Sequence, residues 1–139
     1  MRKTILVLVA FMLITSVVTK PTPVFYDAVG DLSLCLYQAS SLGKFVSVSQ
    51  TDYKNPFIMN GSVKGQCVKN VDLTYAEQVV KRLGAKLSRV ETLADCKVLY
   101  YYTDKLSDYK TIDGDKINLQ VVEKNGVYAM GTPMIFEGF

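Results

Sequence analysis

Carboxylate pairs are the first side chains of this sequence whose types and spacing could support chemistry. Glu91 and Asp95 are four residues apart, and Asp113 and Asp115 flank a glycine. Glycosidases hold two carboxylates roughly 5–10 Å apart in a cleft, so a carboxylate-based hydrolase is one hypothesis. No pattern in the sequence indicates such a cleft, and an Asp-Gly-Asp stretch is typical of a solvated turn.

The chain contains no histidine and no tryptophan. Histidine is the commonest general acid and base at neutral pH, so Ser-His-Asp and Cys-His catalytic arrangements are excluded, as are zinc sites with histidine ligands. Asp113, Asp115 and Asn118 lack the spacing and the terminal glutamate of an EF-hand. We therefore predict a non-enzymatic protein with no catalytic residue, no cofactor and no metal.

Tyrosines form the most unusual local pattern. Tyr100, Tyr101 and Tyr102 are consecutive in a segment rich in β-forming residues. Successive side chains on a strand point to opposite faces, so at least one should face the core and at least one should be exposed or half-exposed. Tyrosine is favoured at interfaces because it combines a large rigid surface with a polar tip. We predict that exposed members of the run, with Tyr128, form a binding surface; the simpler interpretation is core packing.

Residues 1–19 are predicted to be a cleavable secretory signal peptide. Arg2 and Lys3 supply positive charge, and the following Thr4–Thr19 is uncharged and almost wholly apolar. As a helix this stretch would span about 24 Å, which is less than a bilayer core of roughly 30 Å. We therefore expect cleavage after Ser16 or Thr19, secretion, and no stable membrane span.

Removal of the leader changes the charge of the chain. Residues 20–139 remain, and these 120 residues suffice for a single domain with a core. The full chain has 16 basic and 13 acidic residues, a net charge of +3, and loss of Arg2 and Lys3 lowers this to +1. Nucleic-acid binding needs a concentrated basic surface, and the remaining basic residues are scattered. We therefore exclude nucleic acid as a partner.

Three cysteines, Cys35, Cys67 and Cys96, lie in the predicted mature chain. An exported chain meets an oxidising compartment, so we expect one intramolecular disulfide. Three pairings are open, and the third cysteine is either a buried small hydrophobe or the link of a disulfide-linked homodimer. Asn60 begins an Asn-Gly-Ser sequon that is also a turn signal, and it is the predicted glycosylation site.

In the first half of the chain, residues 22–43 are predicted to form a helix because apolar residues recur at helical spacing. The alternative is a strand over Leu32–Tyr37. Lys44–Gln50 alternates apolar and polar residues, as a half-buried strand does. Residues 51–56 are predicted to be a loop, and residues 57–63 a short hairpin.

The second half begins with the clearest helix, predicted over Thr74–Leu87. Thr74 and Glu77 have the spacing of a capping box, and one side of the helix is apolar. The elements that follow are predicted from turn and strand signals: a helical turn over Thr92–Cys96, a strand over Lys97–Thr103, a turn at Asp113-Gly114, a hairpin of Lys116–Glu123 and Gly126–Met130 around Asn125-Gly126, and an edge strand over Met134–Phe136.

This order of elements predicts a small single domain of the α+β class. An antiparallel sheet would be covered on one face by one or two amphipathic helices. Each element lies in residues 20–139, and no repeat or linker divides that stretch.

The segment Thr74–Thr92 resembles the first-helix region of C-type lectin-like domains. Val80 stands where that family normally has a cysteine, and without tryptophan the family's Trp motifs and its calcium-binding Trp-Asn-Asp segment are missing. The resemblance covers about 19 of 120 residues, and no site residue is carried over from it. The matching points are Ala76 and Glu77, Leu83-Gly84-Ala85, Leu87, and Glu91-Thr92, which would lead into a second helix.

Export, small size and the lack of a catalytic motif together favour a secreted, non-enzymatic interaction protein. Its partner would be an extracellular protein, a glycan or a cell surface. The alternative is a carrier of a small apolar ligand, which agrees with a hydrophobic content of 49% that the leader inflates. Further alternatives are a C-type lectin-like module and a carboxylate-based hydrolase.

Peptide mapping of the secreted protein tests the predicted processing. We expect an intact mass and an N-terminal peptide that place cleavage after Ser16 or Thr19, because the apolar segment is too short to remain as an anchor. The same map reports the cysteine pairing and any glycan on Asn60. Recovery from membranes of a chain that still begins at Met1 would overturn the predicted cleavage.

Overall fold

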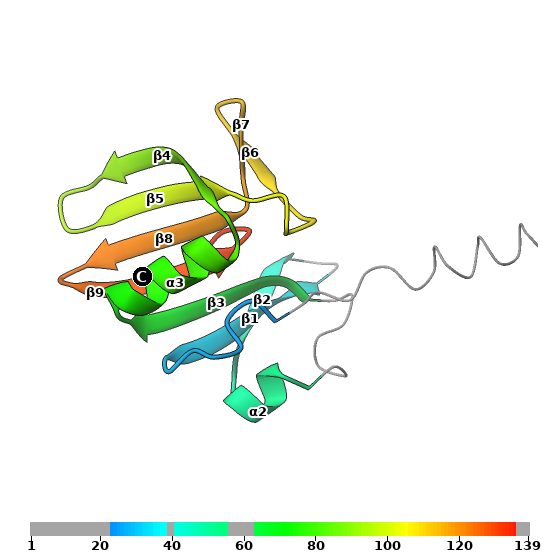
Figure 1. The fold of residues 1–139 in the computed structure, drawn as a ribbon. Helices are drawn as coiled ribbons and strands as arrows, with labels where there is room; N and C mark the ends of the chain where they lie inside the picture. Colours follow the sequence, from blue (N-terminus) through cyan, green and yellow to red (C-terminus); the bar gives the residue numbers. More distant parts are fainter. Residues whose placement is uncertain (1–22, 39–40, 56–62, 136–139) are drawn as a thin grey trace, which may run out of the picture.

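The computed structural model describes residues 23–38, 41–55 and 63–135, and its frame is a seven-stranded antiparallel sheet (Figure 1). The strand order is β2-β1-β3-β9-β8-β5-β4, so β2 and β4 are the two edges. The strands are β1 (Asp31–Gln38), β2 (Ser41–Val48), β3 (Val63–Val71), β4 (Lys86–Thr92), β5 (Lys97–Tyr102), β8 (Leu119–Lys124) and β9 (Val127–Thr132), and a separate two-stranded sheet holds β6 (Lys110–Ile112) and β7 (Asp115–Ile117).

Helix is scarce in the described part of the chain. The single turn α2 (Gln50–Tyr53) and the ten-residue α3 (Leu73–Arg82) are its α-helices. None of the helices found among residues 23–38, 41–55 and 63–135 is long and apolar enough to cross a membrane. The domain is therefore mainly antiparallel β with some helix, which agrees with the predicted sheet at that level.

The predicted helix over residues 22–43 is wrong, and the alternative strand over Leu32–Tyr37 is confirmed within β1. Leu32 and Leu34 point to the core that faces α3, while Ser33 between them points to the opposite face of the sheet. Apolar residues at every second position satisfy the strand period, and several of them also fall at helical spacing. A Cβ at Gly30 would collide with the carbonyl oxygen of Lys69, so the chain enters β1 in close contact with β3.

From β2 to β3, only part of what the sequence predicted is found in the structure. The half-buried strand predicted over Lys44–Gln50 is confirmed as β2, which begins at Ser41 and ends at Val48. Part of the predicted loop 51–56 is instead α2, whose N-cap Ser49 accepts a hydrogen bond from the N–H of Asp52 at 3.1 Å. Most of the predicted hairpin 57–63 lies outside the described residues. Strand β3, which continues to Val71, was not predicted.

Helix α3 is confirmed with different ends. Its N-cap is Asp72, whose carboxylate accepts from the N–H of Tyr75 at 2.8 Å, so the predicted cap at Thr74 is wrong. The helix ends at Arg82, and Gly84 follows with φ of 58°, a left-handed conformation that suits glycine. The chain then forms β4, so the predicted helix to Leu87 and the helical turn predicted over residues 92–96 are both wrong, as is the second helix implied by the resemblance to C-type lectin-like domains.

The C-terminal strands agree best with the sequence. The predicted strand over Lys97–Thr103 is β5, and the predicted hairpin is β8 with β9. Asn125 and Gly126 have φ of 53° and 76°, as the two central residues of a type I′ turn require. Asp113-Gly114 likewise turns between β6 and β7. Residues 134–135 form no strand and Phe136 is not described, so the predicted edge strand is not found.

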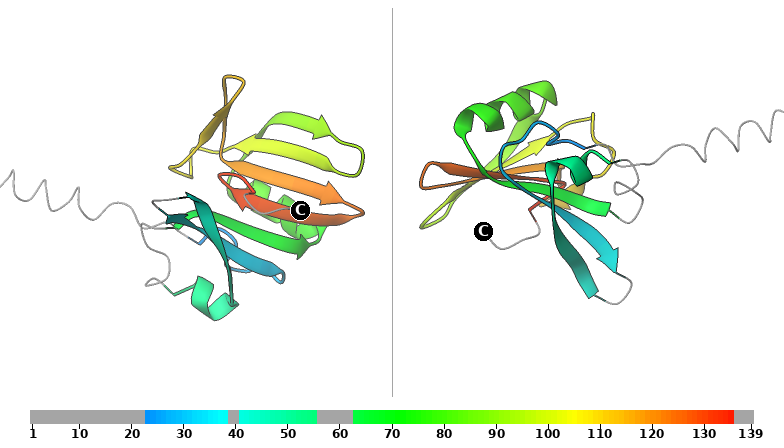
Figure 2. Two further views of the ribbon diagram at one scale, coloured as in Figure 1. Left: turned by 180° about the vertical axis from the view of Figure 1, so that it is seen from behind. Right: turned by 90° about the horizontal axis from the view of Figure 1, so that it is seen from below.

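The main hydrophobic core lies between α3, the N-terminal segment and one face of the sheet. Ala76 and Val79 are the buried residues of α3, and they pack with Val68, Val121 and Met130 of the strands. A smaller cluster of Val98, Tyr100, Ile117 and Val122 lies on the opposite face. Figure 2 shows the sheet from behind, with α3 on its far side.

The N-terminal segment, residues 23–30, is joined to the end of α3 by one arginine. The Arg82 guanidinium donates to the Val24 carbonyl oxygen at 2.6 Å and to the Asp27 carboxylate at 3.0 Å. It also lies over the Tyr26 ring at 4.6 Å, a cation–π distance. These contacts hold the segment against the α3 side of the sheet.

Tyr53 is the centre of a buried hydrogen-bond network that joins α2 and β3 to the N-terminal segment. Its buried hydroxyl donates to Oε1 of Gln66 at 2.5 Å and accepts from the N–H of Phe25 at 2.8 Å. The same Gln66 oxygen accepts from the N–H of Val24 at 2.9 Å. Burial raises the pKa of the Tyr53 phenol far above its ordinary value, so the group stays protonated and can donate.

We expect Tyr53→Phe to lower the free energy of unfolding by about 1–3 kcal/mol, because the substitution removes the acceptor of the buried Phe25 N–H. Urea denaturation measures the loss. Tyr109→Phe is the matched control: Tyr109 is exposed, and we expect a change within about 0.5 kcal/mol. Equal effects of the two substitutions would contradict the importance of the Tyr53 hydroxyl.

Candidate functional site

A groove of about 680 Å³ lies between α3 and the sheet. One wall is the side of α3 that carries Val80, and the floor is the part of the sheet formed by β5, β8 and β9. Volumes of this size are ordinary for small-molecule sites. Its lining residues are Leu73, Ala76, Glu77, Val80, Lys81, Gly84, Ala85, Lys97, Leu99, Tyr101, Val121, Glu123 and Tyr128.

Strand alternation and register place the floor of this groove. Leu99 and Tyr101 are two residues apart on β5, so both point toward α3. Leu99 lies opposite Val121 of β8, and Val121 lies opposite Met130 of β9, in the main core. Because the middle of the floor is apolar and continuous with that core, the groove favours apolar groups.

Positively and negatively charged side chains border the apolar floor in equal numbers. Lys97 and Glu123 are cross-strand partners at one end of β5 and β8. Glu77 and Lys81, four residues apart, line the helical wall. The groove thus has two cations and two carboxylates at its margin and no net charge.

The structure separates the tyrosines that the sequence grouped together. Tyr101 and Tyr128 both line the groove and are half-buried. Tyr100 points to the other face, where its hydroxyl donates to Oε2 of Glu91 at 3.1 Å. Tyr102 lies opposite Lys86 of β4 and does not line the groove. Two of the four predicted binding residues therefore meet at one site.

The chemical environment of Tyr101 differs from that of an exposed tyrosine. Burial raises the pKa of its phenol above the ordinary value, and the negative charge of Glu77 raises it further. Glu77 therefore acts on the hydroxyl from the helical wall of the groove. The phenol is protonated at neutral pH and is available as a hydrogen-bond donor.

No pattern in the sequence identified the helical wall of the groove. Val80 and Ala76 belong to the apolar stripe of α3, which is the ordinary signature of a core-facing helix. Ala76 is indeed buried, whereas Val80 is only partly buried and lines the cavity. The burial of Ala76 and of Val80 differs because the sheet extends beyond the helix on the side of Val80. The periodicity of α3 carries no information on the extent of the sheet.

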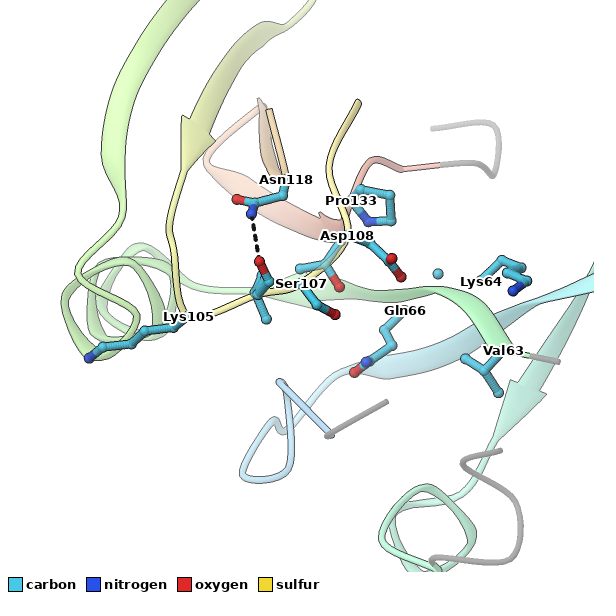
Figure 3. Close-up of a pocket in the computed structure, with 11 residues that line it drawn as sticks. Val63, Lys64, Gln66, Lys105, Ser107, Asp108, Asn118 and Pro133 are labelled. Carbon is cyan, nitrogen blue, oxygen red and sulfur yellow. Dashed lines mark hydrogen bonds between the residues drawn. The ribbon is translucent and has the colours of Figure 1, made fainter. Parts of the chain in front are cut away.

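A second, smaller cavity of about 120 Å³ lies near the chain segment after β5 and is shown in Figure 3. Asn118 at its border is fully engaged: Nδ2 donates to the carbonyl oxygen of Thr103 at 2.7 Å, and Oδ1 accepts from the N–H of Thr103 at 2.9 Å. A further contact of 3.4 Å joins Nδ2 to the carbonyl oxygen of Leu106. Asn118 therefore fixes the loop, and the cavity has room for little more than a few waters.

Three of the four carboxylates considered for catalysis, Glu91, Asp95 and Asp113, are engaged in ion pairs outside the groove. Asp113 pairs with Arg89, which also contacts Glu91 at 3.6 Å. Asp95 pairs with Lys124 at 3.2 Å, and this contact lowers the pKa of its carboxyl. Within the described ranges no three potential His, Cys, Asp or Glu ligands come together around a metal position.

The cysteines lie on neighbouring strands and at a turn. Cys35 of β1 and Cys67 of β3 are buried, and because they lie opposite Gly65 and Ser33 respectively they share one face as diagonal neighbours. Cys96 is half-exposed in the turn between β4 and β5. Cys35 and Cys96 are both thiols in this structure, so the disulfide stays a prediction. Asn60 lies outside the described residues, and its glycosylation is likewise a prediction.

Comparison with known proteins adds no family. No protein-family model, no curated protein and no solved structure matches this chain.

Titration of Tyr101 tests the geometry of the groove. We expect Glu77→Gln to lower the pKa of the Tyr101 phenol, which should still remain above the ordinary value for tyrosine because burial is the larger cause. NMR of protein labelled on the tyrosine ring carbon that bears the hydroxyl measures the titration. Glu123→Gln is the matched control, and a larger shift from it than from Glu77→Gln would contradict the placement of Glu77 beside Tyr101.

Proposed function

We propose that this chain is a secreted, non-enzymatic binding protein formed by a single α+β domain, and that its helix–sheet groove holds a small apolar ligand. The observation that carries the proposal is the apolar floor of a cavity of about 680 Å³. A site of this size and lining suits a drug-sized molecule or a single hydrocarbon chain. The proposal develops the carrier hypothesis, which the sequence supported only by its hydrophobic content and its β-rich C-terminal half.

The polar groups of the groove support a ligand with one hydrogen-bonding end. Tyr101 keeps its proton at neutral pH, so its hydroxyl can donate to a ligand oxygen. The four charged residues lie at the margin and cancel one another, which favours a neutral ligand over an ion. A largely apolar molecule with a hydroxyl, carbonyl or ester group fits this arrangement.

A substitution that fills the groove tests the proposal. Ala85 lines the cavity and is half-buried, so Ala85→Trp should occupy ligand space without leaving a void. We expect it to weaken the binding of N-phenyl-1-naphthylamine, an uncharged fluorescent probe of apolar sites, by about tenfold or more. Fluorescence titration of the folded protein measures this affinity.

The matched control is Ala94→Trp, which makes the same change at an exposed residue of the β4–β5 turn outside the groove. Probe affinity should stay at the wild-type value in this variant. Native mass spectrometry of the protein from its own secretions then looks for a co-purifying apolar molecule, which should be lost on Ala85→Trp. Equal probe affinity in all three proteins would show that the groove is not the apolar site.

A macromolecular partner is the second candidate, and one observation favours it. Leu87 and Val90 of β4 are large apolar residues that are about half exposed, at 52% and 43%. They lie on the same face of the sheet as the groove floor, because they pair with Tyr101 and Leu99. The apolar surface therefore extends past the groove to the edge of the sheet, where a larger partner has access.

A further inference from the structure

Strand β4 is an edge of the seven-stranded sheet, and α3 does not cover it. Figure 1 shows α3 over the middle of the sheet, with β4 beyond it. Three of the large apolar residues that are exposed in the described chain belong to this strand and the turn after it: Leu87, Val90 and Leu93. Exposed edges and exposed apolar groups on one strand are the features that make a strand available for pairing.

The backbone groups at the centre of β4 point away from the sheet. The N–H of Leu93 donates to the carbonyl oxygen of Cys96, so the backbone of Leu93 faces β5. Hydrogen-bonding direction alternates along an antiparallel strand, and the register is regular from Arg89 to Thr92. The N–H and C=O of Val90 and of Thr92 therefore face outward, where another strand can pair with them.

We propose that a second copy of this chain adds to the sheet at β4, with the two β4 strands antiparallel about a two-fold axis at Val90. This register pairs the outward backbone groups of Val90 with those of Val90 in the second copy. It also places the two exposed Val90 side chains beside each other on the axis, on the face of the sheet that carries the groove floor.

Charge complementarity selects this register. With Val90 on the axis, Arg89 of each copy lies opposite Glu91 of the other. Both side chains lie on the face away from α3 and are about one-third exposed. A two-fold axis at Arg89 would instead place like charges opposite each other, which is unfavourable. The sequence of β4 is therefore complementary to itself in one antiparallel register.

The length of the proposed contact is limited by a β-bulge. The register of β4 with β5 shifts between Leu87 and Arg89, which makes Ser88 the extra residue. Bulges shorten the regular part of an edge, so open-ended addition of strands is disfavoured. A short seam with four charges and one apolar pair corresponds to a weak dimer, with a dissociation constant of about 10 µM.

Charge reversal provides the sharpest test, with sedimentation equilibrium and native mass spectrometry as the measurements. Arg89→Glu places glutamates opposite each other, and Glu91→Arg places arginines opposite each other. Each variant alone should dimerise about 100-fold more weakly than the wild type. An equimolar mixture of the two variants should form a heterodimer with near wild-type affinity, because every contact across the axis again joins opposite charges.

Controls exclude unfolding and disulfide formation as causes of a change in dimerisation. Circular dichroism and the unfolding midpoint establish that each variant is folded, and a reductant in every sample removes any disulfide-linked dimer. Val90→Lys, at the axis, should also abolish the dimer, whereas Val127→Lys, at a comparably exposed valine of the β8–β9 hairpin, should leave it intact. A wild-type chain that stays monomeric to about 1 mM, or a mixture that stays monomeric, would overturn the proposal.

Discussion

The packing of one short helix on a wide sheet determines most of the surface of this protein. A helix with its side chains is about 10–12 Å wide, whereas seven strands span about 29 Å across the sheet. Ala76 and Val79 bury the middle of the sheet, and residues 23–30, held by Arg82, lie beside the helix. The remaining apolar face, over β5 and β4, is the floor of the groove and the exposed surface around Val90.

The two faces of the sheet carry different side chains because successive strand residues alternate between them. Tyr100 and Tyr101 are adjacent in sequence, yet Tyr101 borders the groove while Tyr100 packs with the small cluster behind the sheet. The hydroxyl of Tyr100 donates to Glu91, and Arg89 contacts the same carboxylate. The charged residues of β4 therefore lie on the face away from α3, and its apolar residues extend the face on which α3 packs.

Turn chemistry made the C-terminal half predictable. Asn125-Gly126 and Asp113-Gly114 adopt positive φ, so the local sequence determines where the chain reverses. Residues 22–43 lacked such a signal, and apolar residues there satisfy the helical and the strand period together. Strand β1 forms because β2 and β3 pair with it on both sides, a tertiary contact. The groove depends on the same kind of information: Tyr101 and Tyr128 were identifiable as candidates, but their common position required the order β9-β8-β5.

The proposed ligand site and the proposed dimer would share a surface. A two-fold axis through Val90 that is perpendicular to the sheet keeps the α3 helices of both copies on one face. The apolar floors would then meet along the seam at Leu87 and Val90, which are exposed in one copy alone. A ligand that contacts both floors binds the dimer more tightly than the monomer, and by linkage it strengthens dimerisation by the same factor. A ligand confined between Val80 and Tyr101 has no such effect, because its contacts are complete within one chain.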